Sequence, residues 1–237
     1  LHPVAHSFPT RRSSDLPKLN DLYWLPGGNP DLRPEQGYAG DLSIEYQVNK
    51  DTSWKMNTGI TGFFSCIDDW IIWRPGEYRY WQAENIRKVF ARGIEYQLSI
   101  GYIHRRWKFG FNGNYAFTRT TNQESTTEGD NSTGKQLIYI PVHKANGMLN
   151  ISRKKNYLTY TYAFTGERFT TSGNEDTRHT LPSYGLHHLT AGRKFNILKC
   201  SCELQVKIFN LMNTDYQAVL WRPMPGRSFM AVVKLGF

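Results

Sequence analysis

Regular alternation of apolar and polar residues is the main pattern of this chain. In an extended strand, side chains point to opposite faces with a period of two. In the last ten residues, one face would carry Phe229, Ala231, Val233, Leu235 and Phe237. The pattern therefore predicts a terminal strand with one apolar stripe.

Similar alternation recurs through the rest of the chain. It is found at residues 41–48, 53–64, 93–100, 107–118, 158–165 and 203–208. Residues 137–152 and 183–195 alternate less well but also read as strands. Together with the terminal strand, these segments predict about nine strands.

The same period assigns side chains to faces. We expect Trp107, Phe109, Phe111, Leu158, Tyr160, Tyr162, Val233 and Leu235 on an outer, convex face. We expect Glu95, Asn112, Asn114, Thr159, Glu203 and Gln205 on the inner face.

The connections between the predicted strands alternate in length. Short turns are expected near residues 49–51, 104–106, 154–156 and 196–198. Long loops are expected near residues 70–84, 122–136, 170–182 and 213–226. Short turns at one end and long loops at the other are typical of a transmembrane barrel. The predicted fold class is all-β, an antiparallel up-and-down transmembrane β-barrel segment.

Composition agrees with a barrel that crosses a membrane by strands. The mean hydropathy is −0.56, and no run of about 18 apolar residues is present, so no transmembrane helix is expected. A spanning strand needs only one apolar face, which leaves the mean hydropathy low. Aromatic residues make up 14% of the chain, which suits membrane-interface girdles and also a sugar-binding surface.

Charge follows the predicted division into two ends. The formal net charge is +9. Basic residues at or beside the short turns are Lys50, Arg105, Arg106, Arg153, Lys154, Lys155 and Lys199, whereas the long loops carry Glu124, Glu128, Asp130, Glu175 and Asp176. A nucleic-acid site would need basic residues and stacking aromatics on one face, so no nucleic-acid partner is expected. Three cysteines make no disulfide framework.

The first residues look foreign to the rest. Residues 6–16 are similar to the in-frame translation of a widely used sequencing-library adapter. We therefore expect residues 1–16 to be a non-native tail and exclude them from functional reasoning. The expectation is a fragment whose true amino-terminal part is missing, with residues 17–237 as the native segment.

Four motifs carry a family resemblance. Residues 27–35 read Gly-Gly-Asn-Pro-Asp-Leu-Arg-Pro-Glu, a turn bracketed by residues that break strands. Further motifs are Arg-Gly-Ile-Glu at 92–95, Ile-Pro-Val-His at 140–143, and Asn-Leu-Met-Asn at 210–213 followed by Pro-Gly-Arg at 225–227. In this order, the set resembles the carboxy-terminal barrel of TonB-dependent outer-membrane receptors.

The resemblance implies a particular setting. Barrels of that family have 22 strands and a plugged lumen. About nine of those strands would lie in this chain. It implies energy-coupled uptake of a scarce ligand, such as a siderophore, cobalamin or glycan, across a Gram-negative outer membrane. The implied partners are outer-membrane lipid, the missing plug and strands, and TonB through the missing amino-terminal part. It also implies that Phe237 is an assembly signal.

One stretch is a candidate ligand site. Clustered Trp and Tyr outside a membrane are costly unless they pack or bind. The predicted extracellular loop near residues 70–84 carries Trp70, Trp73, Arg74, Tyr78, Tyr80 and Trp81. These residues fit either a share of a ligand site or an interfacial girdle with loop packing.

Two other classes of protein stay open from the residues alone. An outer-membrane enzyme barrel would need a nucleophile and a base near one rim, and no such arrangement stands out. A soluble, aromatic-rich carbohydrate-binding β-sandwich fits the composition but not the strand lengths or loop alternation. We expect no catalytic residues, no cofactor and no metal site.

Overall fold

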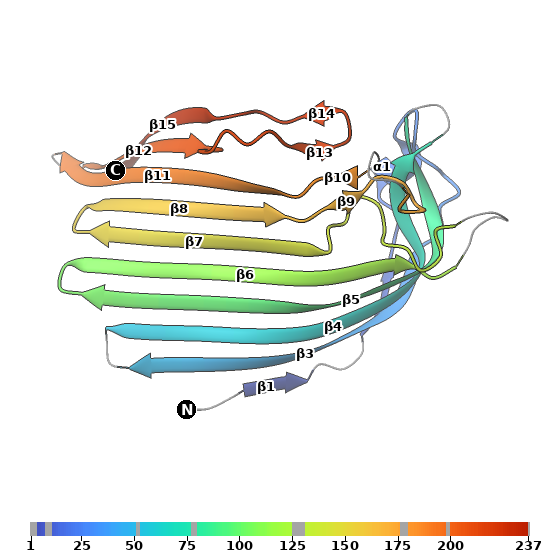
Figure 1. The fold of residues 1–237 in the computed structure, drawn as a ribbon, viewed down its shortest axis with the longest axis horizontal. Helices are drawn as coiled ribbons and strands as arrows, with labels where there is room; N and C mark the ends of the chain where they lie inside the picture. Colours follow the sequence, from blue (N-terminus) through green and yellow to red (C-terminus); the bar gives the residue numbers. More distant parts are fainter. Residues whose placement is uncertain are drawn as a thin grey trace.

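The computed structural model describes residues 4–7, 11–50, 53–76, 80–124, 131–175, 180–197 and 200–236. Its main feature is one large antiparallel sheet (Figure 1). The nine long strands of this sheet are β3 Glu35–Lys50, β4 Trp54–Pro75, β5 Trp81–His104, β6 Trp107–Asn122, β7 His143–Arg153, β8 Asn156–Thr165, β11 Tyr184–Ile197, β12 Cys200–Phe209 and β15 Ser228–Gly236.

The nine long strands form a meander. Each pairs with the next along the chain, in the order β3-β4-β5-β6-β7-β8-β11-β12-β15. At one end β5 and β6 are joined by two residues, as are β7 and β8, and both turns contain a residue with positive φ, Arg105 and Lys154. Two-residue loops of this kind match the twist of paired strands. The predicted up-and-down connectivity is therefore confirmed.

The sheet has an apolar face and a polar face. Directly opposed residues in an antiparallel pair share a face, so the register carries the assignment from strand to strand. Phe111 is paired with Leu149, which is paired with Tyr160, and Asn112 is paired with Met148, which is paired with Thr161. Continued across the sheet, the register places all eight residues expected on the outer face together, and all six expected on the inner face together.

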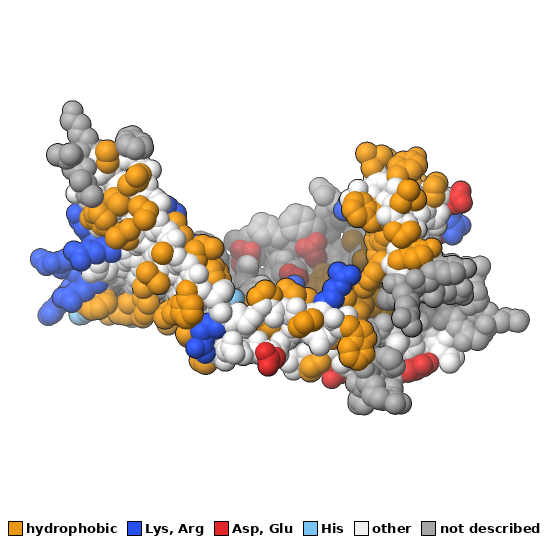
Figure 2. Space-filling view, turned by 90° about the horizontal axis from the view of Figure 1, so that it is seen from above, with side chains coloured by type: hydrophobic (Ala, Val, Ile, Leu, Met, Phe, Trp, Pro, Cys, Tyr) orange, Lys and Arg blue, Asp and Glu red, His pale blue; other side chains and the backbone are white. Residues whose placement is uncertain are grey.

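Basic side chains gather at the end that carries the short turns. Figure 2 shows Lys and Arg at the left end of the molecule, which is the turn end in Figure 1. The two-residue turns themselves are Arg105-Arg106 and Lys154-Lys155. Lys199 and three of the predicted loop acids, Glu128, Asp130 and Asp176, lie outside the described residues. The two ends of the sheet therefore differ in charge.

The apolar core lies at the end of the sheet that carries the long connections. Its buried cluster is Ile86, Val89 and Leu137, and Trp70, Ile72 and Ile140 pack against it. By contrast, many large apolar side chains of the sheet are exposed, including Ile44 and Val206. A single sheet with an exposed apolar face needs another apolar medium to cover it.

Short elements complete the end with the long connections. These are α1 Leu19–Tyr23, β9 Arg168–Phe169, β10 Thr180–Leu181, β13 Gln217–Val219 and β14 Arg222–Pro223. The pairs β9–β10 and β13–β14 form small hairpins. Among the described residues, no helix is long and apolar enough to cross a membrane.

The segment expected to be foreign also contributes strands. β1 Val4–Ser7 and β2 Arg11–Asp15 both pair with the free edge of β3. An open edge presents unpaired backbone groups that any extended segment can use. The foreign origin of residues 1–16 stays a prediction.

Two predicted boundaries are wrong. The long loop expected near 70–84 is strand, because β4 runs to Pro75 and β5 begins at Trp81. The strand expected over 137–152 begins only at His143, and Leu137 and Ile138 are buried side by side in the preceding connection. Alternation fails at both places because both faces of the chain are covered.

Candidate functional site at the loop end

The loop end, where the long connections lie, is built on the projecting part of the β4–β5 hairpin. These strands stay paired out to Pro75 and Trp81. Figure 1 shows their tips standing upright beside α1, away from the direction of the other strands. Within β4, Asp69 has a positive φ of 57°, which is uncommon for a residue with a side chain.

Asn85 joins this hairpin to the segment before β3. Its amide nitrogen donates to the backbone carbonyl of Asp69 at 2.6 Å and to that of Arg33 at 3.0 Å. Its carbonyl oxygen accepts the backbone N–H of Arg33 at 2.9 Å. The Arg33 guanidinium also pairs with the Asp69 carboxylate at 2.6 Å. The residue of positive φ is thus held from two sides.

One face of the hairpin is covered by residues 18–34. The indole N–H of Trp73 donates to Asp21 Oδ1 at 2.8 Å, and the backbone N–H of Ala83 donates to the Gly27 carbonyl at 2.8 Å. A Cβ on Gly27 would lie 1.7 Å from the carbonyl oxygen of Trp81, so only glycine permits this close approach. The Gly-Pro-rich turn therefore packs against the hairpin and holds it in position.

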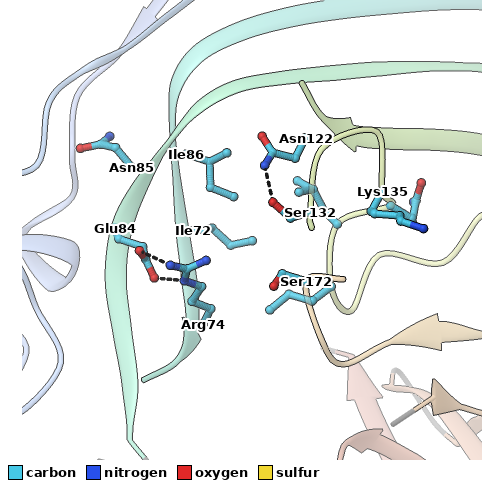
Figure 3. A pocket seen from close by; sticks show the side chains of 12 residues that line it. Ile72, Arg74, Glu84, Asn85, Ile86, Asn122, Ser132, Lys135 and Ser172 are labelled. Carbon is cyan, nitrogen blue, oxygen red and sulfur yellow. Dashed lines mark hydrogen bonds and ion pairs between the residues drawn. The ribbon is translucent and has the colours of Figure 1, made fainter. Parts of the chain in front are cut away.

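The other face of the hairpin carries Trp70, Ile72 and Arg74. Trp70 and Ile72 pack on the apolar core. The Arg74 guanidinium donates to both carboxylate oxygens of Glu84, one of them at 2.7 Å (Figure 3). Paired bonds of this kind are the strongest form of Arg–carboxylate contact. The charge of Arg74 is therefore matched within the hairpin.

The structure thus divides the predicted site residues. Trp73 lies on one face of the hairpin, and Trp70 and Arg74 lie on the other. Trp81 lies at the tip, with its ring 5.4 Å from the ring of Tyr139. The Tyr80 carbonyl accepts the backbone N–H of Gly76 at 2.9 Å. Tyr78 and Phe237 lie outside the described residues, so both of these predictions stay predictions.

A small cavity lies between the hairpin and the neighbouring loops (Figure 3). Its lining includes Ile72, Glu84, Asn122, Ser132 and Ser172. Its volume is about 30 Å³, enough for one or two water molecules. Sites for organic ligands are about ten times larger or more. This cavity is therefore a small gap between packed elements and is not by itself a ligand site.

A pair of amides locks two loops together. Gln136 is buried, and its backbone N–H donates to Asn174 Oδ1 at 2.8 Å. The Asn174 amide nitrogen donates back to the Gln136 carbonyl at 2.9 Å. The side chain of Gln136 also accepts the backbone N–H of Thr120 and donates to the Ile140 carbonyl. Sequence reasoning missed both residues, because nothing local marks a Gln–Asn contact across 38 positions.

Arg168 joins two further loops and was also missed. It is buried, and its guanidinium donates to the Gln217 carbonyl at 3.1 Å and, more weakly, to those of Ala218 and Pro182 at 3.4 Å. It lies over the ring of Tyr184 at 5.0 Å. Burial lowers the pKa of the Arg168 guanidinium, which nevertheless stays charged in a protein. The loop end is therefore a set of interlocked connections.

The described residues hold no cluster for a metal. In these ranges, no three His, Cys, Asp or Glu side chains are grouped closely enough to bind an ion.

Comparison with known proteins decides the family. A family model described as "TonB dependent receptor-like, beta-barrel" matches residues 11–211. The chain belongs to this family of receptor β-barrels. Barrels of this type face lipid with their apolar band, so we expect the apolar face of the sheet to be the lipid-facing one.

Relatives and solved structures agree with this assignment. The chain is 24% identical over 225 residues to "Vitamin B12 transporter BtuB" of Photobacterium profundum, which covers 93% of the chain and 33% of the relative. It is 31% identical over 99 residues to the protein of the same name in Vibrio vulnificus, covering 39% and 15%. The chain therefore spans a third or less of the length of these relatives.

Two solved structures share the fold. "Copper transporter OprC" matches with a TM-score of 0.67 and 16% identity, covering 98% of this chain and 38% of that chain. The ferric-catecholate import receptor Fiu from E. coli K12 matches with a TM-score of 0.64 and 17% identity, covering 94% and 32%.

The comparisons also bear on the two other classes of protein. The matched relatives are named as transporters and receptors, so they give the enzyme-barrel alternative no support. The β-sandwich alternative is wrong, because the chain forms one continuous sheet that matches receptor barrels. In this chain the sheet is not closed into a barrel.

Proposed function

We propose that this chain is the carboxy-terminal barrel segment of an outer-membrane receptor that takes up a scarce ligand by energy-coupled transport. Support comes from family membership and from the length of the chain, about a third of its matched relatives. The open sheet needs the remaining strands to close, since every backbone polar group in lipid must be paired. The segment alone is therefore not transport-competent.

The observation that carries this proposal is the two-faced sheet with its locked loop end. The polar face offers amide and hydroxyl groups, as where Ser99 Oγ donates to Asn112 Oδ1 at 2.8 Å. A wall of this kind suits the lumen of a barrel, against a missing plug. The loops joined by Gln136 and Arg168 would then form one side of the entrance.

The partners follow from the same proposal. Outer-membrane lipid would cover the apolar face, and the plug and remaining strands would cover the polar face and both edges. TonB would act through the amino-terminal part of the receptor, which is not in this chain. No cofactor and no nucleic acid are part of the proposal.

We further propose that the ligand is a metal-bearing complex. The names of the matched proteins refer to vitamin B12, copper and ferric catecholate, which are all metal-bearing. A glycan is the other candidate, because exposed aromatic rings such as that of Trp221 suit sugar stacking. An uptake assay can distinguish a metal-bearing ligand from a glycan.

The test uses the full receptor that contains this segment, in a host strain without receptors for the ligands used. Labelled cobalamin, ferric siderophores and an oligosaccharide are supplied separately, with and without a functional TonB. TonB-dependent accumulation of a metal complex is the expected result. Accumulation of the oligosaccharide alone would overturn the choice of ligand, and TonB-independent accumulation would overturn the proposed function.

A matched pair of variants tests the role of the loop end. Trp81→Ala removes the ring at the hairpin tip, next to Tyr139. Trp107→Ala removes a ring of the same size on the apolar face near a short turn. We expect the first to weaken ligand binding and the second to leave binding unchanged per folded receptor. Equal binding in both variants would remove Trp81 from the site.

A further inference from the structure

Two arginines face each other on the apolar face of the sheet. Arg92 of β5 and Arg119 of β6 are direct cross-strand partners. Their Cβ atoms are therefore about 5 Å apart, and like charges placed so are destabilising. The next pair on the same face, two residues nearer the short turns, is Ile94 with Phe117. Both arginine side chains therefore lie on the lipid-facing side.

No ion pair among the described residues includes either arginine. The three ion pairs of the described residues involve Arg33, Arg74 and Lys88, and neither Arg92 nor Arg119. The Arg92 guanidinium donates to Thr121 Oγ1 at 3.3 Å and lies 4.8 Å from the centre of the Phe90 ring. These contacts fix its position but supply no negative charge.

The depth of the arginine pair relative to a membrane follows from the length of apolar strand between the pair and the short turns. On β5 the apolar face runs over residues 94–102, and on β6 over residues 107–117, which are nine and eleven residues. A tilted strand needs about 9–11 residues to cross the hydrocarbon. Arg92 and Arg119 are the next residues on that face, toward the long loops. The pair therefore lies at the headgroup level of the outer leaflet.

Both arginines line an open hollow. It has a volume of about 620 Å³, and its apolar walls include Leu42, Phe64 and Ile94. Asp41 also lines the hollow, but its cross-strand partner is Phe63, so its side chain belongs to the polar face. Gly62 lies within the hollow, and a Cβ at Gly62 would have no heavy atom within 4 Å. Missing side-chain volume on a lipid-facing surface leaves room for an acyl chain.

We propose that Arg92 and Arg119 bind the phosphate of a phosphorylated outer-leaflet lipid, and that the hollow at Gly62 receives one of its acyl chains. Guanidinium groups match phosphate oxygens with paired hydrogen bonds. The anion neutralises two like charges that are otherwise opposed. This site rests on the family assignment and on the lipid-facing side, and is independent of which ligand is taken up.

The test measures lipid retained by the full receptor that contains this segment. The receptor is loaded with bis-phosphorylated lipid A, washed in detergent, and the lipid per receptor is counted by mass spectrometry. We expect Arg92→Gln with Arg119→Gln to lower retention about tenfold, since a charged hydrogen bond is worth at least that factor. The control is Arg153→Gln with Arg193→Gln, which removes two arginines from the same face at the short-turn end.

Further arms identify the chemistry. Dephosphorylated lipid A should be retained poorly by the unchanged receptor, and millimolar inorganic phosphate should not displace the phosphorylated lipid. Gly62→Leu should lower retention with both arginines present, whereas Gly147→Leu, also on the apolar face, should not. Heat-modifiable mobility checks that each variant is folded.

The proposal is overturned by any of three results. One is equal retention in the two double-arginine variants. Another is equal retention of the phosphorylated and dephosphorylated lipids. The third is displacement by inorganic phosphate, which would show an anion site without a lipid. Each can occur with uptake intact, so failure here is distinct from failure of the proposed function.

Discussion

Two regions of this chain are stabilised in different ways. One is the wall, which is the part of the nine-stranded sheet between the short turns and the core, and the other is the loop end. In the wall, neighbouring strands repeat one pattern, and large apolar side chains such as Ile44 and Val233 remain exposed. At the loop end, Val89 and Leu181 are fully buried, and side chains distant in sequence hydrogen-bond to backbone groups. The wall depends on an external apolar medium, whereas the loop end is packed by the chain itself.

This difference separates two kinds of mutational effect. A change in the wall alters how the sheet meets lipid, so it affects assembly. A change at the loop end alters local order without changing the lipid-facing surface. The following predictions set the two regions against each other.

The largest effect is expected from a charge on the apolar face. Phe111→Arg places a cation in the wall, where Lys or Arg costs about 2–4 kcal/mol near the bilayer midplane. Asn112→Arg, the adjacent position, places the same charge on the polar face. The amount of folded barrel in isolated outer membranes should fall sharply for the first variant alone. Equal losses would contradict the face assignment.

The next largest effect is expected at Arg168. Arg168→Gln shortens a buried side chain that donates to carbonyls in two loops. The lost charged hydrogen bonds are worth about 1.5–3 kcal/mol each at most, and less at 3.4 Å. Hydrogen exchange of residues 213–224 should speed up while the amount of barrel stays constant. Unchanged exchange would mean that the loops do not depend on Arg168. Arg222→Gln, an exposed change in the same region, is the control.

A smaller effect is expected at Gln136. Gln136→Ala removes the bonds to Thr120 and Ile140. It leaves the buried Thr120 N–H and the part-buried Ile140 carbonyl unpaired, at a cost of about 1–3 kcal/mol. Its backbone link to Asn174 can remain. Local exchange of residues 131–142 should therefore speed up less than residues 213–224 do in the Arg168 variant. Thr133→Ala, an exposed change within the same segment, serves as the reference.

The smallest effect is expected at Arg33. Its side chain is 65% exposed, and exposed ion pairs contribute about 0–1 kcal/mol. Arg33→Ala should leave the hairpin order nearly unchanged, whereas Asn85→Ala removes three hydrogen bonds and should increase exchange over residues 70–86. A larger effect from Arg33 than from Asn85 would reverse the proposed roles.

The same contrast explains what could be predicted from sequence. In the wall, each strand has one apolar face, so alternation alone placed Phe111 and Asn112 on opposite faces. Along residues 70–73, Trp-Ile-Ile-Trp, alternation is absent because residues 18–34 cover one face of the hairpin and the core covers the other. The pattern therefore predicts a loop where the structure has a strand pair.

The links of the loop end could not be predicted from local sequence. Gln136 and Asn174, or Arg168 and Gln217, meet only after the strands between them are paired. The residues of the predicted aromatic cluster are neighbours in the sequence. Because side chains alternate along a strand, Trp73 and Arg74 lie on opposite faces. Adjacency in a strand therefore argues against a shared site.

The central claim is that the apolar face of this sheet meets lipid along its whole length. It is tested most directly by spin labels placed one at a time over residues 109–115 of β6, in the full receptor in bilayers with Cys66, Cys200 and Cys202 replaced. Collision with dissolved oxygen, which concentrates in lipid, should alternate with a period of two. It should be high at Phe109, Phe111, Gly113 and Tyr115, and low at Gly110, Asn112 and Asn114. Uniform accessibility, or alternation with the opposite phase, would contradict the account.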